Sequence, residues 1–476
     1  MALEYDLVIL GAGTGGYVAA VRASQLGMNV AVIEKGKLGG TCLHHGCIPS
    51  KSLLRSAEVY QTVKSASGFG VDIDSFQLNY QQVQARKEQI VEQLYSGVQH
   101  LMKKGGIDVY YGTGRILGPS IFSPSAGTIS VEYDDDTKEN DMLLPTNVLI
   151  ATGSRPKTLK GLELDETTIL SSDGALEMAD LPASITIVGG GVIGVEWASM
   201  LADFEVDVTV VEYAERILPG EDEEIAAEMR RALKKKGVRI VTSASVSAEN
   251  TETSEDGVTV TYEKQGEPHR ISSEKLLISV GRQANLTDIG LENTDIKTAD
   301  GVIAVNEFGQ TKEAHIYAAG DAVGGLQLAH AASHEGITAV EHMAGLNPRP
   351  IKEEMIAKCV YSSPEAASVG LTEKAAVNAG YQVKTGTFSF KAIGKALVLG
   401  DTSGFVKFVS DEETRDLLGV HMIGPHVTDM ISEAALAKLL DAADWEVAET
   451  VHPHPSLSEA IGEAALAVDG KAVHGG

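Results

Sequence analysis

The sequence contains very few cysteines. There are three in 476 residues, too few for a structural disulfide framework in a chain of this length. We therefore expect a reducing compartment, the cytoplasm. The N-terminal residues have no basic stretch followed by an apolar stretch and a cleavage site, so no secretory signal is expected. No apolar run approaches the roughly 18 residues that a membrane-spanning helix needs, so we expect no membrane partner.

Positive charge is also scarce. The chain has 39 Lys and Arg against 66 Asp and Glu, for a net charge of −27. Because binding to phosphate backbones needs a basic face, this balance excludes nucleic acid as an expected partner. The acidity favours solubility, and a basic protein partner is the alternative. The proportions of hydrophobic (43%) and charged (22%) residues are typical of a globular protein, and the length predicts two to four domains.

Two of the cysteines, Cys42 and Cys47, are separated by only four residues. A disulfide between them needs a tightly turned backbone, and Gly46 permits such a turn. Pro49 suits the first turn of a helix, so Cys47 is expected just before a helix N-terminus. The partial positive charge there favours a thiolate. The loop therefore favours a redox-active dithiol.

Two other interpretations of this loop stay open at this point. His44 and His45 lie between the two cysteines, so the segment could be half of a zinc site. The cysteines could also be two buried free thiols. The third cysteine, Cys359, has an apolar neighbour and no cysteine nearby, so we interpret it as a packing residue.

A glycine-rich turn follows a short apolar run near the N-terminus. Gly11, Gly13 and Gly16 form the pattern G-x-G-x-x-G between a predicted strand and a predicted helix, and a second predicted strand ends in Glu34. In such a unit the glycines allow the turn, the approach of a pyrophosphate and close helix packing. The helix N-terminus binds phosphate, and the acid accepts from ribose hydroxyls. The context predicts a dinucleotide site.

The same pattern returns later in the chain. Gly189, Gly191 and Gly194 follow a predicted strand, and the next strand ends in Glu212. The spacing from first glycine to acid is 23 residues in both copies. Two such units predict two dinucleotides and electron or hydride transfer between them. Because an acid repels a 2′-phosphate, Glu212 predicts NAD(H) rather than NADP(H) at the second site.

The C-terminal part, from about residue 348, has no glycine fingerprint and is predicted to be a separate α+β domain. Its most unusual segment contains His454, five residues before Glu459, with prolines on either side of the histidine. A carboxylate on one ring nitrogen would orient the other as a general base, and Ser456 is placed to cap the following helix. The alternative is a pair of surface histidines in a proline loop.

Another predicted strand ends in Gly320 and Asp321, and this aspartate could accept from a ribityl hydroxyl of a flavin or simply form a turn.

Taken together, these segments resemble the pyridine nucleotide–disulfide oxidoreductases, in particular the branch that oxidises dihydrolipoamide. The resemblance covers essentially the whole chain. It rests on the two fingerprints, residues 39–51, 151–156, 281–282 and 320–321, and the segment 452–459.

The resemblance implies an α/β fold with two Rossmann-like dinucleotide-binding domains and a C-terminal α+β dimerisation domain. The expected boundaries are residues 1–150 with 277–347 for FAD, 151–276 for NAD, and 348–476 for dimerisation. The implied activity is FAD-dependent oxidation of protein-bound dihydrolipoamide with reduction of NAD+, as the E3 component of 2-oxoacid dehydrogenase complexes. The implied partners are the dihydrolipoyl domain of such a complex or the carrier of glycine cleavage, and a second copy of the chain.

The resemblance also implies individual roles. Cys42 would meet the dithiol substrate, and Cys47 would be the thiolate beside the flavin. In the family the histidine reaches the active site of the other subunit, so the site would be shared within a homodimer. The implied catalytic residues are Cys42, Cys47, His454 as base, Glu459 as its partner, and Lys51 paired with Glu196. The implied cofactor-binding residues are Gly11, Gly13, Gly16, Glu34, Gly40, Thr41, Lys51, Gly114, Thr152, Gly153, Ser154, Gly320, Asp321, Leu328 and Ala329 for FAD, and Gly189, Gly191, Gly194, Glu212 and Gly281 for NAD. No metal is implied.

Three competing functions fit the sequence less well. Glutathione-type reductases share the cysteine loop and the histidine segment, but they favour NADPH, against which Glu212 argues. Mercuric reductases usually add a cysteine pair near the C-terminus, and residues 464–476 contain none. A non-catalytic zinc- or lipoyl-binding scaffold would leave two complete nucleotide sites unexplained.

Overall fold

The computed structural model describes residues 3–119, 127–135 and 137–475. The chain divides into two compact units. Unit 1 comprises residues 1–52, 82–157 and 282–353, and unit 2 comprises residues 53–81, 158–281 and 354–476. The three domain boundaries expected from the sequence are a finer division and stay a prediction.

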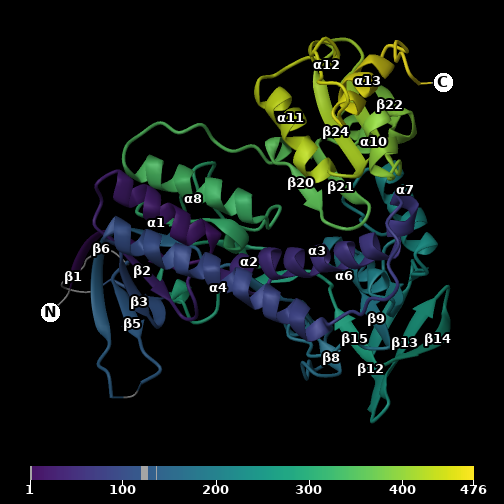
Figure 1. Ribbon diagram of the computed structural model, residues 1–476. Coiled ribbons are helices and arrows are strands. Elements are labelled where there is room, and N and C mark those ends of the chain that lie inside the picture. Colours follow the sequence, from purple (N-terminus) through teal and green to yellow (C-terminus); the bar gives the residue numbers. More distant parts are fainter. Residues whose placement is uncertain (1–2, 120–126, 136, 476) are drawn as a thin grey trace. The chain divides into compact units, whose positions relative to one another are not determined.

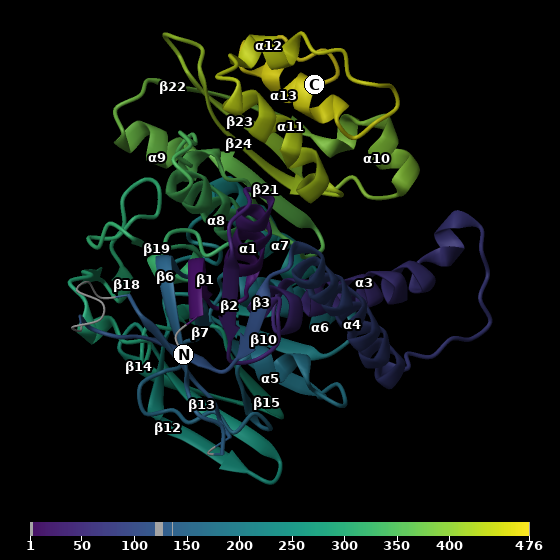
Figure 2. The same cartoon turned by 90° about the vertical axis from the view of Figure 1, so that its left-hand side faces the viewer.

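Unit 1 is built on a seven-stranded sheet. The strands are ordered β3-β2-β1-β6-β5-β4, and β19 pairs with β6. The central neighbours β2, β1, β6 and β19 run parallel, and Figure 2 shows them side by side. The elements are β1 (Leu3–Leu10), α1 (Thr14–Gln25), β2 (Val30–Glu34), α2 (Gly40–His44), the start of α3 (Cys47–Lys64), α4 (Tyr80–Gly105), β3 (Asp108–Tyr111), β4 (Thr113–Ile116), β5 (Ile129–Glu132), β6 (Asp141–Ile150), β7 (Ser154–Pro156), β16 (Arg282–Ala284), β17 (Thr298–Ala299), β18 (Val302–Ile303), β19 (Ile316–Ala318) and α8 (Ala329–Met343).

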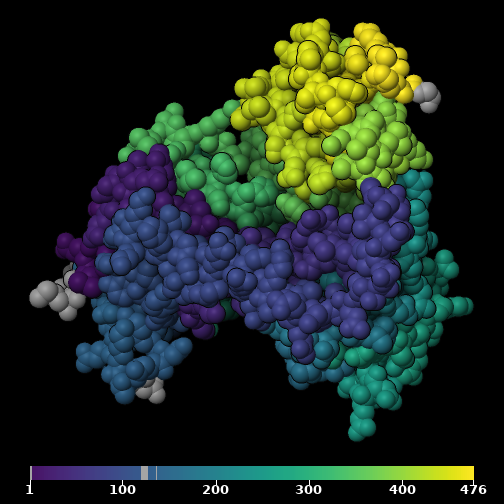
Figure 3. Space-filling view, in the orientation of Figure 1, coloured from purple at the N-terminus to yellow at the C-terminus, as the bar shows by residue number. Residues whose placement is uncertain are grey.

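The sheet of unit 1 is buried on both faces. Leu7 and Ile9 of β1 belong to one apolar cluster, and Val8 and Leu10 to another. A strand that is covered on both faces has a nearly continuous run of apolar residues, so the sequence predicts this strand clearly. Helices α1 and α8 lie side by side (Figure 1). Outside the sheet, α4 has a largely exposed outer face, visible across the front of unit 1 in Figure 3.

Unit 2 contains a second parallel sheet, ordered β11-β10-β9-β15-β8. Next to it in the chain lies an antiparallel sheet, β12-β13-β14, which the sequence pattern does not predict. The elements are β8 (Ile169–Leu170), α5 (Ser172–Leu176), β9 (Ser184–Val188), α6 (Val192–Asp203), β10 (Asp207–Val211), α7 (Glu223–Lys235), β11 (Arg239–Val241), β12 (Ser245–Ser254), β13 (Gly257–Lys264), β14 (Glu267–Ser273) and β15 (Lys275–Ile278).

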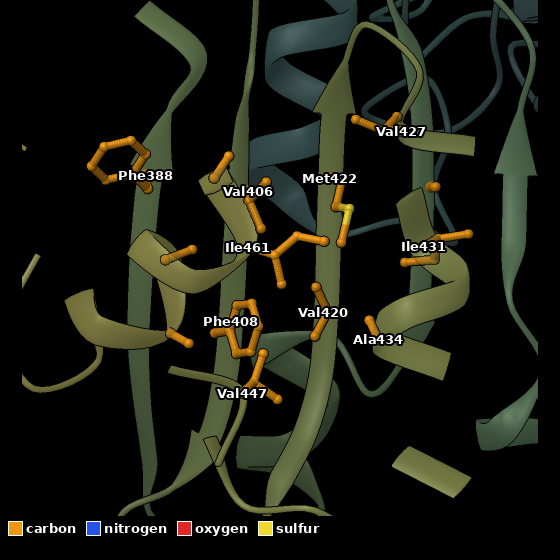
Figure 4. Close-up of a cluster of buried hydrophobic side chains, with 14 of the residues drawn as sticks. Phe388, Val406, Phe408, Val420, Met422, Val427, Ile431, Ala434, Val447 and Ile461 are labelled. Atoms are coloured by element: carbon orange, nitrogen blue, oxygen red, sulfur yellow. The ribbon is translucent and has the colours of Figure 1, made fainter. Parts of the chain in front are cut away.

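The C-terminal part of unit 2 is an antiparallel five-stranded sheet, ordered β20-β21-β24-β23-β22. Figure 4 shows its core, where Ile461 of α13 faces Phe408 of β23 and Met422 of β24. The elements are β20 (Lys358–Val360), β21 (Glu365–Gly370), α9 (Glu373–Asn378), β22 (Val383–Ser389), α10 (Gly394–Leu399), β23 (Phe405–Asp411), β24 (Leu417–Gly424), α11 (Val427–Leu439), α12 (Asp444–Ala448) and α13 (Glu459–Ala467). The fold class predicted from the sequence is confirmed.

Candidate functional site

The first fingerprint forms a tight turn between β1 and α1. Gly11 has φ +97°, and a Cβ there would lie 2.4 Å from the Ala151 carbonyl oxygen. A Cβ on Gly16 would lie 1.9 Å from the Gly11 carbonyl oxygen, so the start of α1 packs directly on the turn. By contrast, a Cβ on Gly13 would meet nothing nearer than 4.0 Å. The middle glycine is therefore not crowded as Gly11 and Gly16 are, since its nearest neighbour at that distance is the Gly40 Cα, and this leaves room for a phosphate.

The second fingerprint, between β9 and α6, repeats this geometry. Gly189 has φ +108°, and its Cβ would lie 2.3 Å from the Ser279 carbonyl oxygen. A Cβ on Gly194 would lie 1.9 Å from the Gly189 carbonyl oxygen, and one on Gly191 would meet nothing within 4 Å. Both turns therefore exclude side chains where the backbone is crowded and leave the middle position open. Each fits a dinucleotide pyrophosphate.

The two acids are held in the same way. In unit 1, the carboxylate of Glu34 accepts from the Ala12 N–H and from the Gly36 N–H, each at 2.7 Å. In unit 2, Glu212 accepts from the Gly190 N–H at 2.5 Å and the Ala214 N–H at 2.6 Å. Each carboxylate oxygen keeps a further lone pair for a ribose hydroxyl. The glycine turn thus positions the acid that follows it by 23 residues.

A group of polar side chains lies where β7, β16 and the turn after β19 meet in unit 1. Ser154 donates its hydroxyl to the Asp321 carboxylate. Arg282 donates to the Ser154 hydroxyl at 2.7 Å and to the Ser154 carbonyl at 2.8 Å, and it lies 3.9 Å from Asp321. Asp321 is thereby oriented by a hydroxyl and a cation, which fits an acceptor for a flavin side chain.

Two residues of this group were missed from the sequence as site residues. The Arg282 guanidinium also reaches the Thr41 hydroxyl at 3.5 Å, so it connects the flavin side of the site to the cysteine loop. Glu335 of α8 accepts from the Gly320 N–H at 2.7 Å, and burial raises its pKa. Sequence spacing offers no signal for either contact, because the partners are 15 to 241 residues apart.

The other predicted FAD residues also lie in unit 1. Gly40 has φ +60°, and a Cβ there would lie 2.5 Å from the Gly13 Cα, so the cysteine loop packs on the first fingerprint. Leu328 precedes the first residue of α8, Ala329. Gly114 packs on Leu10 in the sheet, and Thr152 and Gly153 form the turn after β6. The predicted NAD residue Gly281, in unit 2, has φ +106°.

Cys42 lies in the short helix α2, and Cys47 is the first residue of the 18-residue helix α3. The structure describes them as thiols, half-buried. Their side chains are hydrogen-bonded; this bond and burial raise the pKa of Cys42, while the Lys51 charge acts in the opposite direction. Pro49 lies in the first turn of α3 as predicted, whereas Cys47, expected just before the helix, is its first residue. In this reduced form Cys42 keeps its proton.

The roles predicted for Gly46 and Ser456 need correction. Gly46 does not adopt a left-handed conformation; a Cβ there would lie 3.1 Å from the Thr41 carbonyl oxygen, so its small size permits a close approach rather than an unusual φ. The Ser456 side chain does not cap α13, whose preceding residue is Ser458. Instead the Ser456 backbone N–H donates to Glu459 at 2.9 Å.

His454 and Glu459 form the predicted pair. The His454 Nδ1 lies 2.8 Å from the Glu459 Oε1, which leaves Nε2 as the free ring nitrogen of this pair. The His454 side chain is 78% exposed and that of Glu459 is 26% exposed. Burial would raise the pKa of Glu459, but the hydrogen bonds from His454 and the Ser456 N–H outweigh it and lower that pKa. Glu459 is therefore an anion that orients the imidazole.

Glu196 is buried in α6, and its Oε1 accepts from the Tyr361 N–H at 2.9 Å. Its pairing with Lys51, which lies in the other unit, stays a prediction.

His44, between the two cysteines, points its Nε2 at the Leu38 carbonyl oxygen at 2.9 Å. Across the residues that the structure describes, no three His, Cys, Asp or Glu side chains gather as a metal site would require. Within the same residues, no helix combines the length and apolarity needed to cross a membrane.

Comparison with known proteins places this site in a class. The family model of the pyridine nucleotide–disulphide oxidoreductases matches residues 5–336, and the model of their dimerisation domain matches residues 356–465. The chain belongs to the pyridine nucleotide–disulphide oxidoreductases. It is an enzyme with FAD and NAD as cofactors, and its dimerisation domain supports a homodimer.

More particularly, the chain is 65% identical to a dihydrolipoyl dehydrogenase of Bacillus subtilis over 474 residues, covering 100% of both chains. It is 41% identical to the dihydrolipoyl dehydrogenase of Zymomonas mobilis, again over the whole of both chains. Among solved structures it resembles LpdA from Mycobacterium tuberculosis, with a TM-score of 0.89 and 26% identity over 98% of this chain and 99% of that one. The resemblance inferred from the sequence motifs is confirmed.

Proposed function

We propose that this enzyme oxidises protein-bound dihydrolipoamide to lipoamide and reduces NAD+ to NADH, as the E3 component of 2-oxoacid dehydrogenase complexes. The observation that carries the proposal is a hydrogen-bonded pair of thiols packed against a dinucleotide turn in a chain with a second such turn. The full-length similarity to dihydrolipoyl dehydrogenases supports the choice of substrate. When bound, FAD would accept the electron pair of the enzyme dithiol and supply the hydride that NAD+ takes up.

The roles proposed for the chain's own residues follow from their contacts. His454, oriented by Glu459, takes the proton from one substrate thiol. The resulting thiolate attacks Cys42 in the oxidised Cys42–Cys47 disulfide, a mixed disulfide forms, and Cys47 leaves as a thiolate. The second substrate thiol then closes the lipoyl ring and releases Cys42.

Once both enzyme cysteines are reduced, the electrostatics of the loop favour one arrangement of the remaining proton. The pKa of Cys42 is raised, first by the bond to Cys47 and then by burial, so Cys42 holds the proton. Cys47, at the start of α3, lies where the helix macrodipole stabilises a negative charge. Lys51, one turn further along α3, adds positive charge to the same loop. Cys47 is thus the proposed electron-donating thiolate.

The proposed cofactor sites use the residues of the two turns. Gly11, Gly13, Gly16 and Glu34, with Asp321, would hold FAD. Gly189, Gly191, Gly194 and Glu212 would hold NAD. The fit rests on the open middle glycines and on the acids that the turns position.

We further propose that two copies share each active site, with His454 supplied by the second copy, and that a dihydrolipoyl domain is the protein partner. Exposed apolar residues on and beside α11 support a self-association surface: Leu436, Leu439 and Leu440 are 55%, 46% and 70% exposed. The strongly acidic chain would suit a basic partner segment. Cytoplasmic location stays a prediction that rests on the low cysteine count.

The deciding experiment compares NADH formation from dihydrolipoamide with NADPH consumption by oxidised glutathione. The proposal expects the first reaction alone. Replacement Cys47→Ser should abolish dihydrolipoamide oxidation while FAD stays bound, because FAD binding rests on the glycine turns. Turnover that survives this replacement would remove Cys47 from its proposed role.

A further inference from the structure

The C-terminal loop carries a second histidine–glutamate pair that the mechanism above does not use. The His452 Nε2 lies 2.7 Å from the Glu433 Oε1. The two histidines differ in exposure, since the His452 side chain is only 8% exposed and that of His454 is 78% exposed. Glu433 belongs to α11, so this pair ties the loop after residue 450 to that helix.

His452 also packs directly on α13, the helix that carries Glu459. A Cβ on Gly462 would lie 2.8 Å from the His452 Nδ1 and 3.0 Å from its Cε1, so the ring lies against the helix where only glycine leaves room. The residue is therefore clamped between α11 and α13. Two positions further along the loop, His454 makes its own contact with Glu459, three residues before Gly462.

The charges that face His452 are both acidic. Glu433 on α11 accepts the ring hydrogen bond, and Glu459 on α13 adds a more distant negative charge. The bond to Glu433 raises the pKa of His452, burial acts in the opposite direction, and a hydrogen bond with the Thr450 backbone reinforces the rise. A ring held from both sides in this way cannot rotate without breaking a contact.

We propose that His452 and Glu433 are positioning residues for the thiol half-reaction, which hold the loop so that the His454 imidazole keeps its orientation against Glu459. This inference rests on the proposed function, in which His454 is the base. A loop with two prolines and an exposed histidine would otherwise sample several orientations, and a misplacement of about 1 Å is enough to lower a rate 10²-fold.

The test uses the purified holoenzyme with the replacements His452→Gln and Glu433→Gln, each alone and combined with His454→Gln. The matched control is His474→Gln, because His474 also pairs with a glutamate of α13 (Nδ1 to Glu463 Oε1, 2.6 Å) but lies in the C-terminal tail. Two reactions are measured: NADH formation from dihydrolipoamide, and NADH oxidation by ferricyanide, which needs no thiol base. Hydrogen exchange of residues 450–456 reports the loop itself.

The inference expects both single replacements to lower kcat with dihydrolipoamide about 10- to 100-fold, to leave ferricyanide reduction within about twofold, and to speed hydrogen exchange of the loop. It also expects no further loss when His452→Gln is added to His454→Gln, since a positioning residue acts only through the group it positions. The control should match the wild type in all three measurements.

Three results would overturn the inference: unchanged kcat in His452→Gln, equal losses in both reactions, or an additive loss in the double variant. A wild-type enzyme that does not oxidise dihydrolipoamide would instead refute the proposed function. The hydrogen-exchange comparison then still decides whether His452 holds the loop, so the two failures are distinguishable.

Discussion

Replacement Glu459→Gln tests the orientation of the proposed base with almost no change in size. In the native pair, one carboxylate oxygen faces the His454 Nδ1 at 2.8 Å and the other accepts from the Ser456 N–H at 2.9 Å. A glutamine can satisfy the Ser456 N–H only with its carbonyl oxygen, which turns its NH2 group toward His454. The His454 Nδ1 must then accept, so the proton of the neutral ring moves to Nε2. The nitrogen that should act as base is thereby blocked.

The magnitude follows from the loss of general base catalysis, which contributes 10²–10⁴-fold in typical enzymes. We expect the lower end, about 10² in kcat with dihydrolipoamide, or about 2.7 kcal/mol in the activation free energy, because the exposed ring can flip and recover part of its function. The pKa of Glu459 is lowered, so the native carboxylate is an anion across the neutral range and the comparison holds at pH 7.

The assay is rapid mixing of oxidised enzyme with dihydrolipoamide, followed by steady-state NADH formation. The matched control is Glu463→Gln, one turn further along α13, which holds His474 instead. The control should stay within about twofold of the wild type. A Glu459→Gln enzyme with unchanged kcat would refute the tautomer argument, and an equal loss in both variants would point to a general disturbance of α13.

Three further predictions concern the two turns and the buried histidine. Gly16→Ala should prevent FAD binding, while Gly194→Ala should weaken NADH binding but leave the protein yellow, because each new Cβ would lie 1.9 Å from a carbonyl oxygen of its own turn. Flavin absorbance and NADH titration measure the two effects. Equal effects on both cofactors in either variant would contradict this prediction. Glu212→Arg should raise the use of NADPH relative to NADH and also lower thermal stability, since the two backbone N–H bonds of Glu212 are lost; an unchanged coenzyme ratio would count against the role of Glu212. Because the pKa of His452 is raised in the folded state, the protonated ring stabilises the fold fully below the ordinary pKa of 6.5, and this stabilisation is lost as the pH rises through the higher folded pKa. The melting temperatures of His452→Gln and wild type should therefore converge with rising pH. A constant difference between them would exclude this linkage.

The parts of the site that the sequence predicted well are those whose signal is local. Each fingerprint compresses a strand, a turn and a helix into 23 residues, and the strands are apolar on both faces, so periodicity and spacing indicate them directly. The same holds for the cysteine loop, where Pro49 lies in the first helical turn as predicted and Cys47 lies within one residue of its expected place before the helix. The antiparallel sheet β12–β14 was missed because β12 and β14 are mostly exposed and polar, so they lack an apolar pattern.

The sequence by itself therefore determined the family, the two nucleotide turns, the paired thiols and the pairing of His454 with Glu459, because each of these depends on residues close together in the chain. Only the tertiary structure decided that Arg282 links Ser154 to the cysteine loop and that Glu433 holds His452. Such contacts join residues on different elements, and their energy depends on distance and burial, which chain order does not encode. The positioning residues can be identified only from the tertiary packing, whereas the reacting residues can be identified from local sequence motifs.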